Sequence, residues 1–381
     1  MAQAPAIFSR IGRIRIFLFP SFSRLMTAEL AEYFDFIGYG AAGDLALLAR
    51  AECLEIIPSH YSQLAWAMTN TIRPDILLTT LSRRAEDGRM NLAASKDLIP
   101  TIWAGARVVI AEVNARAPWV EGGILPPEMK ANFEIACDTP LIALQPAIAD
   151  EPAKRIAGHV AGLVPDGATL QFGVGGLMDT ICQALTSHRE LGVHSGIIGD
   201  AVVDLTEAGA LTNSMKAFRR GVTVAGSLMG SRRLLDWAHR NPLLELSSVD
   251  VTHNLDLLKS LPRLTAINSA VEIDLTGQVN AEVAGGVYVG AVGGQVDFIR
   301  AAALAQEGLS ILAFPSTARG RQVSRIVAKL SGPVTTARSD VDCVVTEHGV
   351  ARLKGLSLRQ RREALLAIAD PQHQPCLETA Q

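Results

Sequence analysis

Asn268-Ser269-Ala270-Val271-Glu272-Ile273-Asp274-Leu275-Thr276-Gly277-Gln278-Val279-Asn280-Ala281-Glu282 has the pattern of a β-hairpin. Apolar residues alternate with Glu272 and Asp274, which is the period of a strand with one apolar face, and Thr276-Gly277 is a turn signal. The two carboxylates then point the same way, about 6.6 Å apart, and each charge raises the pKa of the other if water is excluded. A solvated polar face on an ordinary edge strand is the alternative.

A second glycine-rich stretch follows this hairpin and favours a working carboxylate over a solvated one. It contains Gly285-Gly286 and then Gly290-Ala291-Val292-Gly293-Gly294-Gln295-Val296-Asp297-Phe298. Glycine lets the backbone approach a ligand closely, because it has no Cβ.

The order of predicted elements repeats along the chain. A strand, a glycine turn and a helix occur at 34–51 and again at 169–185, and the order of strands and helix between 75 and 113 returns between 264 and 314. We therefore expect an α/β protein with two tandem domains that meet across a cleft, at 26–150 and 151–375. Ligands favour such clefts. Residues 1–25 hold four arginines and no acid, and we expect them to be a disordered extension, with Met26 as the translation start.

Composition excludes several classes of function. The 381 residues are 49% hydrophobic and 19% charged, which is typical of a well-filled globular protein of two domains. A net charge of −3 gives no reason to expect nucleic acid as a partner. The five cysteines are scattered without CxxC spacing and the histidines do not cluster, so we expect no metal site and a cytoplasmic protein with reduced thiols. No segment is long enough to span a membrane.

The segment Gly38-Tyr39-Gly40-Ala41-Ala42-Gly43 matches the spacing of the dinucleotide-binding fingerprint G-x-G-x-x-G. Glu52 and Glu55 come too early to be the acid that binds the ribose. A nicotinamide dehydrogenase therefore remains an alternative that would require hydride transfer. The simpler interpretation is a tight turn from strand to helix, with its amides lining a cleft.

The remaining chemistry is that of a carboxylate beside glycine-rich backbone. The sequence has no G-x-S-x-G elbow and no P-loop. A carboxylate can be a nucleophile toward an activated acyl group, and glycine amides can stabilise the oxyanion. An acyl thioester is a suitable substrate for a carboxylate nucleophile and backbone amides, because a thiolate leaves without the help of an acid.

Seven motifs in a fixed order carry a family resemblance over residues 152–371. They are Leu170-Gln171-Phe172-Gly173-Val174-Gly175, Asp200-Ala201-Val202-Val203-Asp204-Leu205, Met229-Gly230-Ser231-Arg232-Arg233-Leu234, Asn268 to Gln278, Gly293-Gly294-Gln295-Val296-Asp297-Phe298, Pro315-Ser316-Thr317-Ala318 and Val345-Thr346-Glu347-His348-Gly349. In these motifs the chain resembles the acetyl-CoA hydrolase/transferase family, in the branch of the 4-hydroxybutyrate, butyryl and succinyl-CoA:acetate CoA-transferases. The resemblance implies two α/β domains of the NagB/RpiA/CoA-transferase type, with the active site in the cleft between them.

The resemblance also implies roles for individual residues. Glu272 would attack acyl-CoA to give an acyl-glutamyl anhydride and then a glutamyl-CoA thioester, and the amides of Gly349 and, less firmly, Val251 would form the oxyanion hole. The loop that approaches coenzyme A would consist of Gly290, Gly293, Gly294 and Gln295. Coenzyme A is then a substrate, and no cofactor is expected. Glu282 is a weaker candidate for the nucleophile, and Asp274 would tune or position.

Two departures from the family pattern bear on function. The N-terminal half is shorter than is usual for the family, which affects the wall of the acyl pocket. Arg321 follows Gly320 where paired glycines are more common, and it would either contact a phosphate of coenzyme A or point outward. We expect a homodimeric CoA-transferase acting on acyl-CoA and a small carboxylic acid. The alternatives are an acyl-CoA hydrolase that uses the same glutamate and an inactive, shortened CoA-binding protein.

Overall fold

An eight-stranded sheet organises the second half of the chain. The structure is a computed structural model that describes residues 4–22, 25–144 and 149–379. The strands stand in the order β10, β9, β8, β7, β11, β16, β20 and β21, and all neighbours are parallel except β20 with β21. Their bounds are β7 Thr169–Phe172, β8 Gly192–Ile198, β9 Thr223–Leu228, β10 Leu244–Leu246, β11 Leu264–Asn268, β16 Leu309–Ala313, β20 Cys343–Thr346 and β21 Gly349–Arg352.

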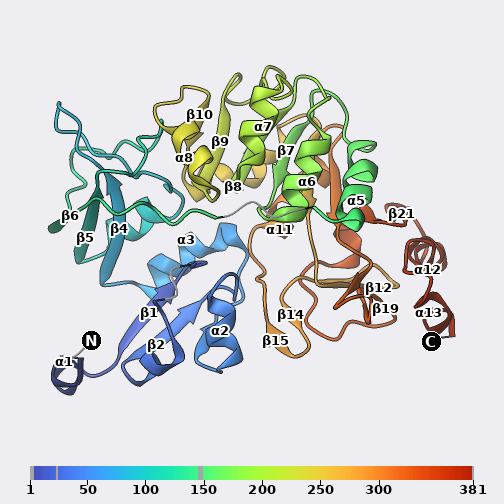
Figure 1. Cartoon of the computed structure of the whole chain (residues 1–381), viewed down its shortest axis with the longest axis horizontal. Coiled ribbons are helices and arrows are strands. Elements are labelled where there is room, and N and C mark those ends of the chain that lie inside the picture. The colour runs from blue at the N-terminus through green and yellow to red at the C-terminus, as the bar shows by residue number, and fades with distance from the viewer. Residues whose placement is uncertain (1–3, 23–24, 145–148, 380–381) are drawn as a thin grey trace.

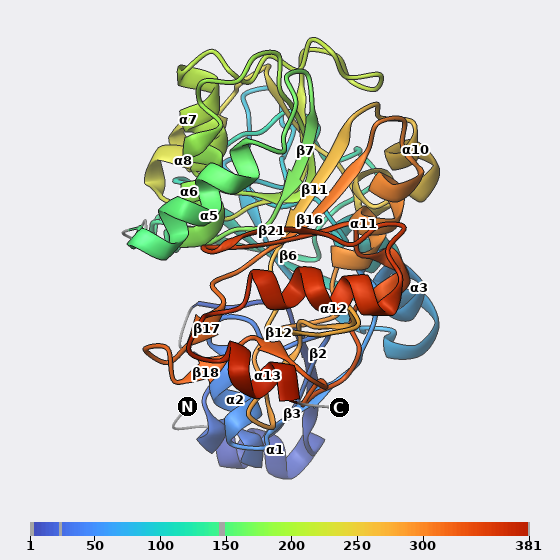
Figure 2. The same ribbon diagram turned by 90° about the vertical axis from the view of Figure 1, so that its right-hand side faces the viewer.

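Helices cover both faces of this sheet, as Figure 2 shows, with α5 to α8 on one side of the strands and α10 and α11 on the other. The helices of this half are α5 Glu151–Ala161, α6 Gly176–Ala184, α7 Ala201–Glu207, α8 Arg232–Ala238, α9 Val249–Thr252, α10 Leu255–Lys259, α11 Gln295–Leu304, α12 Leu358–Ala367 and α13 Gln374–Thr379. Within the described ranges, no helix combines the length and the apolar composition needed to cross a bilayer.

Burial on both faces explains the apolar central strands. All four residues of β7 are buried, as expected for a parallel strand between two layers of helices. Two local features start helix α5. Asp150 caps its N-terminus by accepting a hydrogen bond from the amide of Ala153 at 2.9 Å, and Pro152 lies in the first turn. The expected α/β class is confirmed.

The first half of the chain forms two smaller parallel sheets, which Figure 1 shows on the left of the molecule. One contains β1 Ile14–Leu18, β2 Phe34–Gly38 and β3 Leu54–Ile56, and the other contains β4 Ile76–Ser82, β5 Val108–Asn114 and β6 Phe133–Cys137. The helices are α1 Ala4–Ile11, α2 Leu45–Arg50, α3 Leu64–Ala67 and α4 Ile99–Gly105, with shorter helical turns at Ala28–Glu32, Tyr61–Gln63, Met68–Ile72 and, in the second half, Arg338–Asp340.

The hairpin at 268–282 continues from the end of β11 into a separate small sheet. In this sheet β12 (Glu272–Asp274) lies between β13 (Val279–Asn280), which is antiparallel to it, and β19 (Ile326–Val327), which is parallel. Two short ladders complete the fold: β14 Val283–Ala284 with β15 Val287–Tyr288, and β17 Thr317–Ala318 with β18 Val323–Ser324. Strand β12 is central and all three of its residues are buried, so a solvated edge strand is excluded here.

The structure corrects the expectation that residues 1–25 form a disordered extension. Residues 14–18 form β1, which pairs in parallel with all five residues of β2, so this segment belongs to the fold. Arginines alternate with isoleucines at 13–16, and Ile16 and Leu18 pack against the core around Phe36, whereas Ile14 is exposed. Residues 1–3 and 23–24 lie outside the described ranges.

The predicted repeat is confirmed in part. Strands β4 and β5 pair in parallel with α4 between them in sequence, and β11 and β16 do the same with α11 between them. The order of elements predicted between 75 and 113 is wrong at 90–93, which form no strand and only an isolated bridge between Asn91 and Ile124. Between the halves, β6 ends at Cys137 and α5 begins at Glu151, with residues 145–148 outside the described part of the chain.

We expect Gly40→Ala to destabilise the protein, because the new Cβ would lie 2.3 Å from the Cβ of Ala291 and 2.6 Å from the carbonyl oxygen of Gly290. Overpacking of this kind costs about 1 to 3 kcal/mol of unfolding free energy. Gly158→Ala in α5 is the matched control, since its Cβ meets nothing within 4 Å and should be neutral or stabilising. Urea unfolding measures both variants, and equal stability of the two would contradict the close packing of these loops.

Candidate active site

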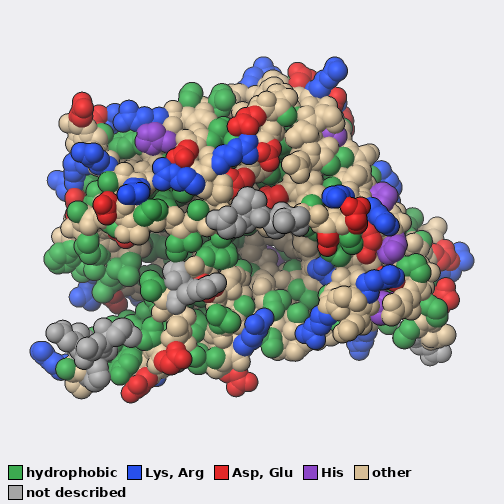
Figure 3. Space-filling view, viewed as in Figure 1, with side chains coloured by type: hydrophobic (Ala, Val, Ile, Leu, Met, Phe, Trp, Pro, Cys, Tyr) green, Lys and Arg blue, Asp and Glu red, His purple; other side chains and the backbone are tan. Residues whose placement is uncertain are grey.

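A cavity of about 490 Å³ lies where the two halves of the chain meet. Figure 3 shows the surface hollowed between the upper and lower parts of the molecule. Most of the lining is apolar or aromatic and comes from both halves: Phe19, Tyr39, Tyr61, Leu77, Leu98, Ile102, Phe172, Ile197, Leu228 and Phe298. The polar lining consists of Ser95, Asp97, Gln171, Ser195, Ser227, His253, Asn268 and Gln295. A mostly apolar cavity with a few polar groups is typical of a small-molecule site.

Backbone hydrogen bonds join the two halves around this cavity. The amide of Ala41 donates to the carbonyl of Gly290 at 2.8 Å, and the amide of Tyr61 donates to the carbonyl of Gly293 at 2.9 Å. On another wall, the amide of Leu228 donates to the carbonyl of Ala94 at 2.8 Å. The glycine turn at 38–43 thus packs on the glycine stretch at 290–294. This contact agrees with the prediction of a tight turn that lines a cleft.

The predicted CoA-binding loop reaches the cavity with three of its four residues. Gly293, Gly294 and Gln295 line the cavity at the start of α11. Gly290 lies behind this wall, where a Cβ would come within 2.1 Å of the carbonyl oxygen of Ala281. The first amides of a helix have no partner within the helix, so the start of α11 offers donors and a positive dipole end to a ligand.

Glu272, the predicted nucleophile, is buried beside the cavity rather than in its wall. Its side chain is 7% exposed and is absent from the lining residues. Its Oε1 accepts hydrogen bonds from the amide of Ser331 at 2.7 Å, from the hydroxyl of Ser331 at 2.9 Å and from Nδ2 of Asn280 at 3.0 Å. These contacts hold the carboxylate against Asn280 and the loop at Ser331.

The two neighbouring acids shape the same hairpin. Asp274 Oδ1 accepts from the amides of Thr276 at 2.8 Å and Gln278 at 3.0 Å, which closes the turn, as the positioning role predicted for it requires. Glu282 is buried and accepts from the hydroxyl of Thr335 at 2.7 Å. Neither side chain lines the cavity.

The predicted oxyanion donors are not brought to the cavity wall. The amide of Val251 donates to the carbonyl of Ser248 at 3.0 Å, so its hydrogen is already engaged inside α9. Gly349 has a φ of 146°, which favours glycine, and it closes the turn between β20 and β21 opposite Thr346. Neither residue lines the cavity, and their proposed role stays a prediction.

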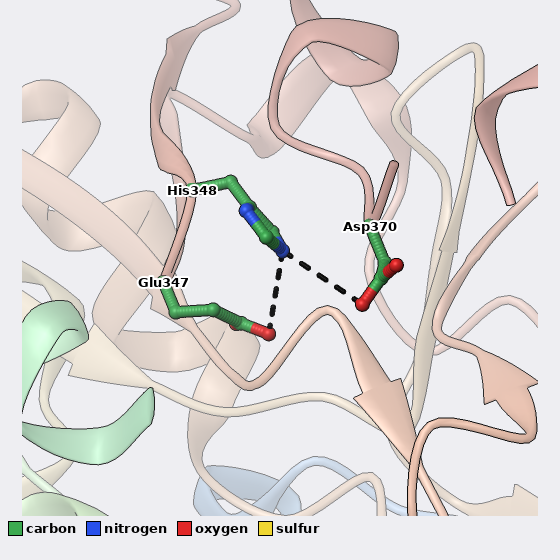
Figure 4. A group of neighbouring side chains, drawn as sticks. All are labelled: Glu347, His348 and Asp370. Carbon is green, nitrogen blue, oxygen red and sulfur yellow. Dashed lines mark ion pairs between the residues drawn. The ribbon is translucent and has the colours of Figure 1, made fainter. Parts of the chain in front are cut away.

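The turn next to Gly349 carries a cluster of titratable side chains, which Figure 4 shows. His348 Nε2 lies 3.7 Å from Glu347 Oε1 and 3.9 Å from Asp370 Oδ2. Asp370 is held by Arg321 through two hydrogen bonds of 2.9 and 3.0 Å, and the Arg321 guanidinium lowers the pKa of this carboxyl. Both oxygens of Glu347 accept hydrogen bonds from Ser316. One ligand atom from each of Glu347, His348 and Asp370 lies within 4.8 Å of the others, and the structure contains no ion. Arg321 has a carboxylate partner although its side chain is largely exposed.

Asp97 is the site residue that sequence reasoning missed. Among the described residues that line the cavity, it is the one carboxylate. Its Oδ2 accepts from the hydroxyls of Tyr61 at 2.7 Å and Ser227 at 3.3 Å, while Oδ1 is buried without a hydrogen-bond partner. Burial raises the pKa of Asp97 to about 6, although both hydrogen bonds act in the opposite direction. The φ of Asp97 is 33°, a left-handed backbone conformation that cannot be read from the sequence.

His253 forms the floor of the cavity between two aromatic rings. Its ring centroid lies 4.8 Å from that of Tyr61 and 4.9 Å from that of Phe298. Gly196 and Gly294 make room for the imidazole, since a Cβ on either residue would come within 2.6 Å of it. Burial lowers the pKa of His253 to about 3, so the ring is neutral at pH 7.

Comparison with known proteins places these features in one family. The N-terminal domain of acetyl-CoA hydrolase/transferase matches residues 52–128, and the C-terminal domain of the same family matches residues 230–381. The 4-hydroxybutyrate coenzyme A transferase of Clostridium kluyveri is 39% identical over 305 residues, which cover 80% of this chain and 71% of that protein. The acetyl-CoA hydrolase of Neurospora crassa is 27% identical over 77% of this chain and 62% of that protein.

Solved structures agree with this relationship over almost the whole chain. RipA from Yersinia pestis superposes with a TM-score of 0.90 at 30% identity, covering 99% of this chain and 89% of that one. The 4-hydroxybutyrate CoA-transferase of Porphyromonas gingivalis gives a TM-score of 0.80 at 32% identity, covering 98% and 95%. The CoA-transferase type of fold is therefore confirmed.

The hydrogen bonds to Glu272 predict that truncating this side chain costs more unfolding free energy than neutralising it. Glu272→Ala removes the acceptor, leaves a donor hydrogen of the buried Asn280 unpaired and frees the Ser331 donors at the surface, which should lower the unfolding free energy by about 1 to 3 kcal/mol. Glu272→Gln keeps an acceptor oxygen and should lose less than half of that. Denaturant unfolding of the two variants measures the difference, and equal losses would contradict the assigned contacts.

The raised pKa of Asp97 predicts a pH dependence of stability. Its pKa is 3.8 without perturbation and about 6 in the folded protein, so between these values the folded state binds more protons than the unfolded state. Stability then falls as the pH rises from about 4 to 6, by on the order of 2 to 3 kcal/mol. Asp97→Asn should flatten this slope and raise stability at pH 7. Urea unfolding across this range, with Glu282→Gln as control, checks it; an unchanged slope in Asp97→Asn would contradict the burial cost.

Proposed function

The chain belongs to the acetyl-CoA hydrolase/transferase family, and we propose that it transfers coenzyme A between a short-chain acyl-CoA and a carboxylic acid such as acetate, butyrate or 4-hydroxybutyrate. The observation that carries this proposal is the cavity between the halves, in which the start of α11 and one carboxylate face an apolar space. The relatives named as CoA-transferases, at up to 39% identity, support transfer as the reaction.

The proposed route is covalent and proceeds through a carboxylate of the protein. The carboxylate oxygen bonds to the thioester carbon, the C–S bond breaks, and coenzyme A leaves as the thiolate with the electron pair. The thiolate then attacks the carboxyl carbon of the protein, which gives a protein-CoA thioester and releases the acyl group as its carboxylate. A second carboxylic acid reverses both steps, so no proton is consumed overall.

The start of α11 suits the developing negative charge in this route. Gly293, Gly294 and Gln295 line the cavity there, and the amides of the first helical turn have no partner inside the helix. Such donors stabilise an oxyanion and a departing thiolate without reorganisation. The family resemblance assigns the nucleophile to Glu272, and this role remains a prediction.

Hydrolysis is the second candidate, favoured by the acetyl-CoA hydrolases among the relatives. Water would then open the protein-CoA thioester in place of the second acid. The apolar lining of the cavity disfavours this outcome, because it limits the water available to the intermediate.

We expect ping-pong kinetics and dependence on an acceptor acid. With butyryl-CoA as donor and acetate as acceptor, double-reciprocal plots at several acetate concentrations should be parallel, and acetyl-CoA should form in proportion to the butyryl-CoA consumed. Chromatography of the CoA species measures both. Release of free coenzyme A at the same rate without acetate would favour the hydrolase. No turnover with any acyl-CoA would favour the inactive CoA-binding protein.

A further inference from the structure

We propose that the preferred acid substrate of this protein carries an unbranched apolar chain longer than that of butyrate, which lies along a row of aromatic rings in the cavity. The inference rests on the proposed transfer of coenzyme A and adds the substrate class. It follows from the order of the rings, from the pairing of the polar groups beside them and from the open apolar end of the cavity at Leu78.

Five rings form a continuous row along the cavity, which we call the aromatic row. The ring centroid of Phe298 lies 4.9 Å from that of His253, and His253 lies 4.8 Å from Tyr61. The row continues from Tyr61 to Tyr39 at 5.4 Å and from Tyr39 to Phe19 at 6.2 Å. All five residues line the cavity. Because Phe298 belongs to α11 and Phe19 follows β1, the row crosses from the second half of the chain to the first.

The rings of this row are uncharged at neutral pH. Burial lowers the pKa of His253 to about 3 and raises the pKa values of Tyr39 and Tyr61. At pH 7 the imidazole is therefore neutral, and both phenols keep their protons. Leu98 and Ile102 add aliphatic side chains to the same cavity lining. A hydrocarbon chain can thus be buried here without removing water from a charged ring.

The polar side chains in the middle of the cavity are paired within the protein. The hydroxyl oxygens of Ser95 and Ser227 lie 2.7 Å apart, and the hydroxyl of Ser195 donates to a backbone carbonyl at 2.8 Å. Oδ2 of Asp97 accepts from the hydroxyls of Tyr61 and Ser227, and its Oδ1 is buried. An apolar chain that covers these groups therefore breaks none of their hydrogen bonds, so their presence costs it little.

The end of the cavity next to the hairpin at 268–282 suits the polar head of an acyl substrate. Asn268, the first residue of this hairpin, exchanges hydrogen bonds of 2.9 and 3.3 Å with Gln171. Both side chains line the cavity, as does Gln295 at the start of α11. The aromatic row begins on the same helix, one turn after Gln295. With the thioester at the start of α11, the acyl chain extends along the row toward the first half of the chain.

The cavity opens onto an apolar surface in the first half. Leu78 in β4 lines the cavity although it is 73% exposed. Its partner in the sheet is Ile110 of β5, whose own partner is Phe133 of β6, which is 61% exposed. Figure 1 shows β1 and β4 on the same side of α11. Parallel sheets usually have both faces covered. The apolar lining therefore continues outward past Leu78, and this end sets no wall against a long chain.

The length of the aromatic row separates short from longer acids. An extended butyryl chain is about 4 Å long and an octanoyl chain about 9 Å, because a carbon–carbon bond measures about 1.5 Å. One step between neighbouring rings measures 4.8 to 6.2 Å. A butyryl chain therefore passes about one ring and leaves the others facing water, whereas a longer chain covers them. Each methylene buried in this way raises affinity by up to about fourfold.

Non-reactive CoA thioethers measure the preferred chain length in the unmodified protein. Butyl-CoA, hexyl-CoA and octyl-CoA are compared as inhibitors of CoA transfer from butyryl-CoA to acetate. We expect the inhibition constant to fall by about twofold to fourfold for each added methylene. Equal inhibition constants, or weaker inhibition by octyl-CoA, would overturn the inference while leaving CoA transfer intact. Absence of any transfer between butyryl-CoA and acetate would refute the proposed function, and the inference with it.

A matched pair of surface variants tests the course of the chain. Leu78→Lys places a charge at the open end of the cavity, and Ile135→Lys places one on β6 of the same sheet, at a residue that is 58% exposed and does not line the cavity. In Leu78→Lys, kcat/KM for decanoyl-CoA should fall by about threefold to tenfold, with butyryl-CoA changed by less than about twofold. Ile135→Lys should change neither value. Equal losses for both substrates in Leu78→Lys, or no loss for decanoyl-CoA, would overturn the inference.

Discussion

The structure depends on the close approach of two glycine-rich backbones from opposite halves of the chain. The amides of Ala41 and Tyr61 donate to the carbonyls of Gly290 and Gly293, and these contacts leave no room for a Cβ on Gly40. The same approach closes one side of the cavity and sets the start of α11 against it. Because each half supplies part of the wall, neither half forms the site alone.

The buried acids near the cavity differ in their surroundings. Glu272, Asp274 and Glu282 are buried, and donors from their own hairpin or from nearby loops satisfy them. Their charges hold the turn together. Asp97 differs, because it lies in an apolar wall with one oxygen left unpaired, and burial keeps its pKa near 6. At neutral pH this carboxylate is still mostly ionised and is more basic than an exposed one.

Local patterns in the sequence predicted much of the fold, and contacts between distant segments explain most of the rest. Strand β7 and helix α11 were predicted from apolar runs beside glycine, because burial between two helical layers determines their composition. Strand β1 was missed because its arginines suggested a tail, while only pairing with β2 makes it a strand. The place of Asp97 in the cavity wall was missed because it depends on contacts with Tyr61 and Ser227, which lie 36 and 130 residues away. The predicted CoA loop was found from its glycines, three of whose four residues reach the cavity.

The location of the acyl group is the central claim, and a crystal structure with a non-reactive CoA thioether tests it most directly. With butyl-CoA bound, the account predicts that the butyl chain occupies the cavity between the two halves, with its sulfur-bound carbon at the start of α11. A butyl chain bound elsewhere on the protein, with the cavity between the two halves left empty, would contradict the account.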